Sequence, residues 1–554
     1  MIPRQRLPSV LGVIVLTGLA VVRVVSTYKV FNGTYDEPAH IACGMEWLQW
    51  GSNACELQHP PLARVAVALG PFLRGFRLAP EFHSAGERTV SFYEEGNSIL
   101  YAQNQYWTNL AWARAGTLPF LIFLCATTYL WARRWFGHGF GEASGFCAVL
   151  LLVCTAPVLG HAGLATNDLA CAAGATFALY EFLRWLEQPR MARAIWWGAA
   201  TAVAVLCKFS NVPFLLACYA AGLALRPRGA LRGRLRHFLA AGCIAFVLAW
   251  AMYRFTVVAP GMYYGTHHPV IDGILSKRPL LHSAWSSVMA TPLPLAEPAM
   301  GLLDLFVHNA VGHDAYLLGE WSQSGWWYFF PVVLAVKSPI GLLALAALGV
   351  WLVRRRWRAT DWKQSWQQAL TVVFLAAILV VCILSRIDLG VRHILPVYPL
   401  LAILGGHGMV SMFQRSRSAA IAAGLLAAWA AADSARAHPD YLAHFNEFAG
   451  SHPERILCES DLDWGQDLDR LRKRLEQRGV QEFSIAYFGT VPLEKAGLPR
   501  FQYLSAAQPA HGYIAVSLHQ LNIDYKKNGS FGWLKAYMPL ERVGKSIDLF
   551  YVAP

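Results

Sequence analysis

Residues 194–225, AIWWGAATAVAVLCKFSNVPFLLACYAAGLAL, form one apolar stretch that is interrupted at its centre. The interruption contains Lys208, Ser210, Asn211 and Pro213. A charged residue and a proline inside an apolar stretch favour a re-entrant break over one long helix. The stretch therefore predicts two short spans of a membrane protein, residues 194–207 and 211–225.

Composition places the whole chain in a membrane. Of its 554 residues, 55% are hydrophobic and only 15% are charged, which leaves too little polar surface to cover a soluble globule of this size. The formal net charge of +13 does not indicate a nucleic-acid partner, because the basic residues lie between apolar stretches and not in one basic domain. We therefore expect membrane lipid to surround the chain.

Apolar stretches near the length needed to cross a bilayer recur along the first four-fifths of the chain. We predict about eleven spans, counting helices of roughly 20 residues and the two shorter ones. They are residues 8–26, 108–132, 140–159, 167–186, 194–207, 211–225, 238–257, 327–353, 369–385, 394–413 and 418–433. The first span resembles a signal peptide, but no small-residue cleavage site precedes Asn32, so it is counted as a helix.

Charge in the loops predicts the orientation. Basic clusters occupy alternate loops, which the positive-inside rule assigns to the cytoplasm. An odd number of spans then places the C-terminal segment outside, together with the long loops 27–107 and 258–326. Residues 41–50 have the spacing of a short interfacial helix. We expect a multi-pass protein of the inner (plasma) membrane.

The chain changes character at about residue 434. A charged helical stretch, residues 467–478, is followed by β-like runs at 483–488 and 513–518. The expected architecture is an all-α transmembrane domain, residues 1–433, followed by a small extracytoplasmic α/β domain, residues 434–554. Cys43 and Cys55 lie in one outer loop, where a disulfide would persist, but the sequence does not fix their pairing.

Ionisable residues recur at the predicted outer ends of the spans. They are Asp36, Glu37, His59, Asp168, Lys208, Arg392 and His393. Because charged groups at membrane depth face a cavity or one another, this convergence predicts a site for an anionic substrate. Taken singly, Asp168 is equally explained as a helix cap, and Lys208 and Arg392 as side chains that extend to the interface.

The order of these motifs resembles the GT-C superfamily of polyprenyl-phosphate-dependent glycosyltransferases, near family 39, the protein O-mannosyltransferases and the aminoarabinose transferases. The matching elements are Asp36-Glu37, His59 to Leu62, Asn167-Asp168, Lys208-Phe209, Gly319-Glu320, Trp326 to Pro331, Lys337-Ser338-Pro339, Arg392 to Pro399 and Ser460 to Leu468. They run along almost the whole chain. The last element resembles that of bacterial members with an additional outer domain.

The resemblance implies a GT-C fold and inverting transfer of a sugar from a polyprenyl-monophosphate donor. The acceptor it implies is a protein, a glycolipid or a polysaccharide. Asp36 is then the general base, with Glu37 and Asp168 as further catalytic candidates. The implied substrate-binding residues are His59, Lys208, Arg392, His393, Lys337 and Glu320. Of these, Lys208 and Arg392 are expected to bind the phosphate of the lipid and to stabilise its negative charge.

One position departs from the family pattern. Gln58 precedes His59-Pro60-Pro61, whereas many relatives have Glu at this position. A neutral amide is a poorer metal ligand than a carboxylate. A divalent cation is therefore expected only if Glu56 or the pair His267-His268 replaces that ligand, and no other cofactor is expected.

Two other classes of function fit parts of this pattern. A secondary transporter or lipid flippase would also use a broken helix and interior charges, but transporters of this kind have inverted halves and bind substrate near mid-membrane. Here the two halves do not resemble each other, and the candidate residues lie at the outer face. A non-catalytic scaffold for envelope sugar assembly would tolerate loss of Asp36.

Overall fold

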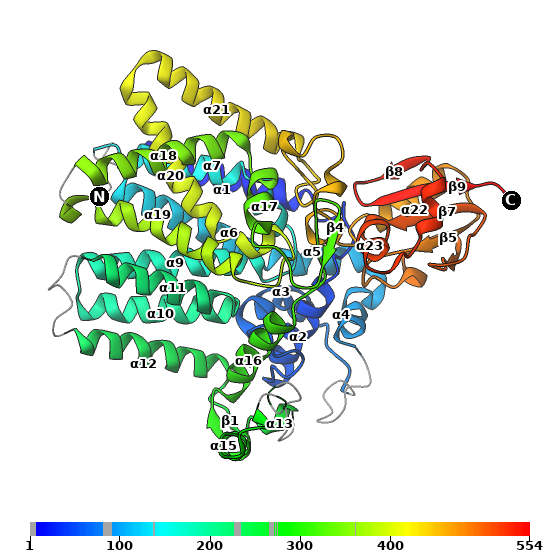
Figure 1. The fold of residues 1–554 in the computed structure, drawn as a ribbon, viewed down its shortest axis with the longest axis horizontal. Coiled ribbons are helices and arrows are strands. Elements are labelled where there is room, and N and C mark those ends of the chain that lie inside the picture. Colours follow the sequence, from blue (N-terminus) through cyan, green and yellow to red (C-terminus); the bar gives the residue numbers. More distant parts are fainter. Residues whose placement is uncertain are drawn as a thin grey trace.

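The computed structural model describes residues 7–80, 91–136, 139–226, 234–264, 271, 273, 275–359 and 362–554. The pair His267-His268 lies outside the described residues. The described chain forms a bundle of long helices with a smaller mixed sheet at one end, and the N-terminus lies at the other end (Figure 1).

Eleven long helices build the bundle within the described ranges. They are α1 (Leu7–Val25), α6 (Leu118–Trp135), α7 (Gly141–Val153), α9 (Asp168–Glu187), α10 (Met191–Cys207), α11 (Asn211–Leu225), α12 (Leu235–Met252), α18 (Ile340–Ala359), α19 (Trp362–Ile383), α20 (Val397–Arg415) and α21 (Arg417–Arg436). Helix α20 packs against α6, α7, α18, α19 and α21 and forms the centre of the largest hydrophobic core.

Not every predicted span passes a simple length and hydropathy criterion. Five helices of the described residues are long and apolar enough to cross a membrane, and two bent helix pairs raise this number to seven. One pair is α7 with α8 (Ala156–Ala162), bent by 69°, and the other is α17 (Phe329–Lys337) with α18, bent by 117°. Each predicted span coincides with at least one helix, but eleven crossings remain a prediction.

The predicted break at Lys208 is present. Helix α10 ends at Cys207, Lys208 has an extended backbone and α11 begins at Asn211. The Asn211 amide donates to the carbonyls of Ala204 and Cys171, at 2.8 and 3.2 Å, and so ties the start of α11 to the last turn of α10 and to α9. The two helices lie side by side (Figure 1), so the break is the turn of a helical hairpin that presents Lys208 at its tip.

The two long loops and the C-terminal segment lie at the same end of the bundle (Figure 1). The first loop folds into α2 (Glu37–Trp50), α3 (Pro61–Leu73), α4 (Phe92–Leu100) and α5 (Tyr106–Ala115). The second contains α13 (Gly261–Tyr264), α15 (Pro279–Ala290), α16 (Ala296–Val311) and the strand pairs β1 (Val257–Val258) with β2 (Leu293–Pro294) and β3 (Ala315–Leu317) with β4 (Glu320–Ser322). A disulfide joins Cys43 of α2 to Cys55, which fixes the loop that precedes α3.

The C-terminal segment forms the small α/β unit that the sequence predicts. Its strands are β5 (Glu482–Ala486), β6 (Arg500–Tyr503), β7 (Gly512–Ser517), β8 (Glu541–Val543) and β9 (Ile547–Val552), in the order β6-β5-β7-β9-β8. Strand β5 is parallel to both β6 and β7, and the remaining pairs are antiparallel. Helix α22 (Leu468–Gln477) packs on the sheet through its leucines, and Phe531 and Leu534 lie in a second apolar cluster with residues of β7 and β9.

The disulfide gives a direct test of this arrangement. The chain has 11 Cys, of which the structure leaves nine as free thiols. Labelling of the denatured, unreduced protein with a maleimide should add nine labels, and prior reduction should raise this number to 11, as measured by intact mass. The variant Cys43→Ser should show ten labels without reduction, because Cys55 becomes free. Eleven labels on the unreduced wild-type protein would disprove the pairing.

Candidate active site

Asp36 and Arg392 form an ion pair at the end of the bundle that carries the loops. Arg392 Nη1 donates to Asp36 Oδ2 at 2.6 Å. Asp36 directly precedes α2, and Arg392 lies in the short 3₁₀ helix η3 (Val391–Ile394) before α20. Asp36 Oδ1 accepts no hydrogen bond from the described part of the chain and its side chain is 27% exposed, so this oxygen faces accessible space.

Two residues of the C-terminal segment complete the surroundings of Arg392. Its guanidinium lies 4.6 Å from the centre of the Trp464 ring, and Glu459 Oε1 is 3.8 Å from Nη2. Burial lowers the pKa of Arg392, but the carboxylates of Glu459 and Asp36 raise it by more, so the guanidinium stays charged. Glu459 has φ of 48°, a conformation that non-glycine residues adopt at a cost of roughly 1–3 kcal/mol and that occurs often at functional sites.

A second ion pair lies between the tip of the helical hairpin and the start of α9. Lys208 Nζ donates to Asp168 Oδ1 at 2.5 Å, and both side chains are buried. His161 Nδ1 lies 3.7 Å from the other oxygen of Asp168. The negative charge of Asp168 thus balances a buried lysine, which would otherwise be expensive to keep charged.

His59 lies close to both ion pairs. Burial, and after it the charge of Lys208, lower the pKa of His59 to about 4, although Asp36 and Asp168 oppose this shift. His59 is therefore neutral at pH 7, and its Nδ1 lies 2.7 Å from Glu56 Oε2. The rings of His59 and His40 pack edge to face, with their centroids 5.3 Å apart.

Several buried polar atoms in this region have no hydrogen-bond partner among the described residues. They are Arg392 Nε, both ring nitrogens of His161 and the side-chain nitrogen of Asn167. Leaving such a group unpaired costs about 1–3 kcal/mol. Because most of these atoms are N–H donors, a ligand with several acceptor oxygens would satisfy them.

Glu37 has a different position from its neighbour. It is fully buried, and its two oxygens accept hydrogen bonds from Arg114 at 2.8 Å each. They also accept from the backbone N–H groups of Thr34 and Ala165. With both oxygens occupied, Glu37 anchors the start of α2 and positions Asp36.

Two further candidates have hydrogen-bond or ion-pair partners outside the cluster. Lys337 is buried and donates to the carbonyls of Leu442 and Asp461, at 2.8 and 2.7 Å, so it joins the bundle to the C-terminal segment. Glu320 lies on β4 with its side chain 71% exposed, and it pairs with Lys526 of the C-terminal unit at 3.1 Å. In the structure, both residues connect parts of the chain.

Glu56, which could replace the missing metal ligand at Gln58, is paired with a cation through one oxygen, and its Oε1 is buried without a partner among the described residues. Glu56 Oε2 is held by both His59 and the guanidinium of Arg64, which is itself buried and hydrogen-bonded to the carbonyls of Glu56 and His59. A positive group therefore already lies against the carboxylate that would replace the missing ligand at Gln58. Within the described ranges, no group of three or more His, Cys, Asp and Glu residues is arranged to hold a metal ion.

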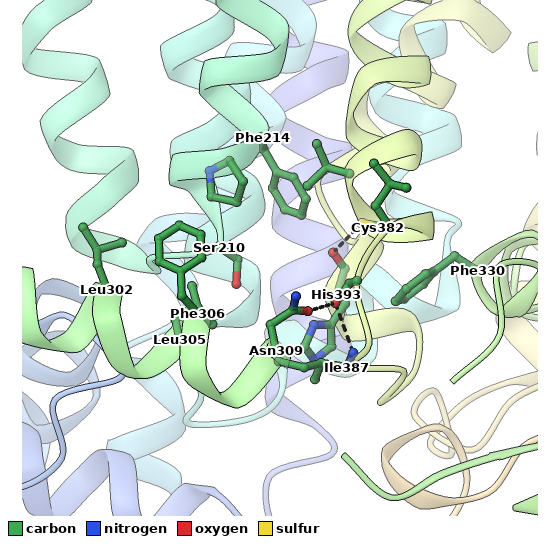
Figure 2. Close-up of a pocket in the computed structure, with 14 residues that line it drawn as sticks. Ser210, Phe214, Leu302, Leu305, Phe306, Asn309, Phe330, Cys382, Ile387 and His393 are labelled. Atoms are coloured by element: carbon green, nitrogen blue, oxygen red, sulfur yellow. Dashed lines mark hydrogen bonds between the residues drawn. The ribbon is translucent and has the colours of Figure 1, made fainter. Parts of the chain in front are cut away.

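An apolar cavity of about 270 Å³ opens beside the cluster (Figure 2). Its lining includes Ser210 and His393, which follow Lys208 and Arg392 closely in the sequence. Figure 2 shows Phe214 of α11 above the cavity, Leu302, Leu305 and Phe306 of α16 on one side, and His393 and Phe330 on the other. Lys208 and Arg392 do not line the cavity, but each lies within two residues of a side chain that does.

The sequence alone did not reveal several residues of this site. Glu459, His161 and Arg64 were missed, and Trp464 was noted only as part of the tail motif. His161 lies in a short connection without a recognisable motif, and the contact of Trp464 with Arg392 depends on how residues 459–469 insert into the end of the bundle. The one available signal was Arg64, a charge within the apolar stretch that follows Pro61.

Fold and site together define a helical membrane protein with the GT-C fold, whose paired charges lie at the end of the bundle that carries the long loops. No protein-family model and no curated protein sequence matches the chain. Similar solved structures include those of two GT-C glycosyltransferases, ArnT and AglB.

ArnT from Cupriavidus metallidurans, solved bound to undecaprenyl phosphate, is 14% identical, with a TM-score of 0.51 and 98% of each chain covered. The archaeal oligosaccharyltransferase AglB from Archaeoglobus fulgidus was solved with an inhibitory peptide and a dolichol-phosphate. It is 11% identical, with a TM-score of 0.51 and with 96% of this chain and 72% of AglB covered. At these identities the likeness establishes the fold.

The different positions of Asp36 and Glu37 predict different effects of their amide variants. Glu37→Gln should lower the free energy of unfolding by about 3–5 kcal/mol, since it leaves the buried Arg114 without a countercharge. Asp36→Asn should lower the free energy of unfolding much less. Glu459 still balances the charge of Arg392 in this variant, and Asp36 is partly exposed. Thermal unfolding in detergent measures both, and equal losses of stability would contradict the assignment of Glu37 to an anchoring role.

Proposed function

We propose that the protein transfers a sugar from a polyprenyl-monophosphate donor to an acceptor at the outer face of the membrane. The observation that carries this proposal is the convergence of two buried cations, Arg392 and Lys208, with Asp36 beside an apolar cavity. ArnT and AglB, which share the fold, were solved with undecaprenyl phosphate and dolichol-phosphate respectively. A lipid phosphate requires both a cationic site and an apolar groove, and this chain has the two side by side.

Arg392 and Lys208 bind the phosphate in this proposal. Arg392 offers Nε, which has no partner among the described residues, and Nη2, which is held only by the distant Glu459 carboxylate. A guanidinium can donate two parallel hydrogen bonds to phosphate oxygens, and an ammonium adds a point charge. The Trp464 ring lies against the guanidinium, the His161 ring lies 6.1 Å from that of Trp464, and His161 and Asn167 have unpartnered nitrogens that can add donors.

Asp36 acts as the general base. Its Oδ2 is held by Arg392, which orients the carboxylate, and its free Oδ1 accepts the proton of the acceptor hydroxyl. The acceptor oxygen then forms a bond to the anomeric carbon while the bond from that carbon to the phosphate oxygen breaks. The electron pair leaves with the polyprenyl phosphate, whose growing charge Arg392 and Lys208 stabilise. Direct displacement inverts the configuration at the anomeric carbon.

The cavity beside His393 receives the first part of the polyprenyl chain. It is formed by apolar side chains of α11, α16, α17 and α19, and the exposed Phe306 and Leu384 continue the apolar surface outward.

Asp36→Asn should lower the transfer rate by roughly 10²–10⁴-fold, the usual contribution of a positioned general base. The assay uses purified protein, radiolabelled polyprenyl-phosphate sugars and an envelope extract as the source of acceptor, and it measures loss of label from the lipid fraction. Arg392→Lys should also reduce the rate, because an ammonium does not reproduce the bidentate contact.

Asp440→Asn provides a matched control for Asp36→Asn. Asp440 also pairs with an arginine, Arg470, at 2.6 Å, and it is similarly exposed, but it lies outside the charge cluster. Transfer should be unchanged in this variant. Transfer that survives Asp36→Asn would reject the catalytic assignment and would favour a transporter or a scaffold.

We also propose that the active site lies on the extracytoplasmic side of the membrane. The charge bias of the loops assigns the site to the extracytoplasmic side of the inner membrane, and the structure brings both long loops and the C-terminal unit to the same end of the bundle (Figure 1). A reporter that is active only outside the cytoplasm should therefore be active when fused after Pro554. A signal from a cytoplasm-specific reporter at this position would reverse the assignment.

A further inference from the structure

A second cavity, distinct from the charge cluster, lies in the C-terminal unit. It has a volume of about 330 Å³ and lies at the carboxyl ends of the three parallel strands β6, β5 and β7. Ile485 and Ala486 end β5, Tyr503 ends β6, and Gln520 follows β7. The connections that leave β5 and β7 run to opposite sides, so this crevice is the point of an open α/β sheet at which ligands bind. We call it the sheet-end crevice.

The chemistry of the lining mixes an aromatic face with hydrogen-bonding groups. Tyr503 is 69% exposed, and its hydroxyl donates to Glu494 Oε1 at 2.9 Å, which orients the carboxylate at the rim. The Gln520 side chain makes no hydrogen bond within the described ranges. Gln520 also begins a π-helical turn, Gln520–Asp524, a rare element that is frequent at functional sites. An exposed ring with a carboxylate and an amide beside it matches the C–H face and the hydroxyls of a pyranose.

The wall of this crevice also contacts the proposed active site. Tyr487 lines the crevice, and its hydroxyl donates to the carbonyl of Gly465, the neighbour of Trp464. Thr490 Oγ1 donates to the carbonyl of Tyr35, the neighbour of Asp36, at 2.8 Å. Residues 487–490 thus contact the crevice on one side and the backbone next to Asp36 on the other. A ligand held in the crevice is therefore close to the general base.

We propose that the sheet-end crevice binds the saccharide part of the acceptor, so that the acceptor of the transfer reaction is a glycan. This inference rests on the proposed function and names its acceptor class. A peptide that binds a sheet by strand addition fits the crevice less well, because this mode requires pairing with a free strand edge. The crevice lies beyond the ends of the strands, where the ladder of backbone hydrogen bonds has stopped.

The first experiment measures binding without any transfer. Short mannose and N-acetylglucosamine oligomers, and a Ser/Thr-rich peptide of similar mass, are tested against the full-length protein in detergent by saturation-transfer NMR. At least one oligomer series should bind, and Tyr503→Ala or Glu494→Gln should each weaken this binding by about tenfold, the scale of one lost aromatic or charged contact.

Tyr551→Ala is the matched control. Tyr551 is also an exposed tyrosine of the same sheet, and it packs edge to face against one ring, Tyr513, as Tyr503 packs against Phe501. It does not line the crevice. Its substitution should leave saccharide binding unchanged, which separates loss of the site from general damage to the sheet.

A second readout ties the crevice to the reaction. In the transfer assay, Tyr503→Ala should raise the KM for a saccharide acceptor by about tenfold, with the change in KM and not in kcat, whereas Tyr551→Ala should alter neither. The proposal is overturned if no oligomer binds, if the crevice variants bind oligomers as tightly as wild type does, or if the peptide binds and Tyr503→Ala weakens its binding. If oligomers bind as expected but no sugar is transferred, the proposed function fails and the saccharide site stands.

Discussion

The guanidinium of Arg392 holds together three parts of the chain that are far apart in sequence. It donates to Asp36 from the first loop, lies over Trp464 and approaches Glu459 from the C-terminal segment. A buried arginine is costly unless carboxylates balance its charge. The packing of the first loop, of the C-terminal segment and of α20 is therefore constrained by this one group.

The C-terminal segment contributes to the site through its backbone. The carbonyls of Trp464 and Gln466 accept from the N–H groups of Tyr35 and Asn32, both at about 3.0 Å, so the segment pairs with the loop that carries Asp36. Asp461 accepts from the N–H of Val391, which fixes the turn before Arg392. Within the described chain, the site is thus assembled from both ends of the sequence.

The broad organisation was predictable because it depends on local properties of the sequence. Apolar length predicts the helices, and the polar interruption at Lys208 predicts the break, since a charge and a proline oppose a continuous helix whatever its surroundings. The resemblance to the GT-C superfamily predicted the fold correctly. The charges that meet at the site were found as a set because each lies at the end of a helix, where loops converge.

What the sequence did not reveal is how each of these charges is compensated. Adjacent acids such as Asp36 and Glu37 look equivalent in a sequence, yet one has a free oxygen and the other accepts from Arg114, Thr34 and Ala165. Glu320 and Lys337 were grouped with the phosphate site by motif order, whereas their partners, Lys526 and Asp461, come from the distant C-terminal unit. Such partners are fixed by tertiary contacts of high sequence separation, which carry no local signal.

The ion pairs of the site also affect how firmly Asp36 is held. Without a donor, Arg392 holds Oδ2 of Asp36 and Lys208 holds Asp168, so both cations are balanced by carboxylates. Under the proposed function, a donor phosphate would add negative charge where Arg392 Nε and His161 lack partners among the described residues, and the cations would then be shared between phosphate and carboxylates. Because sharing weakens each contact, the carboxylate of Asp36 is held less firmly once the donor is bound. Under the proposed function, binding of the donor thereby prepares Asp36 to accept a proton from the second substrate.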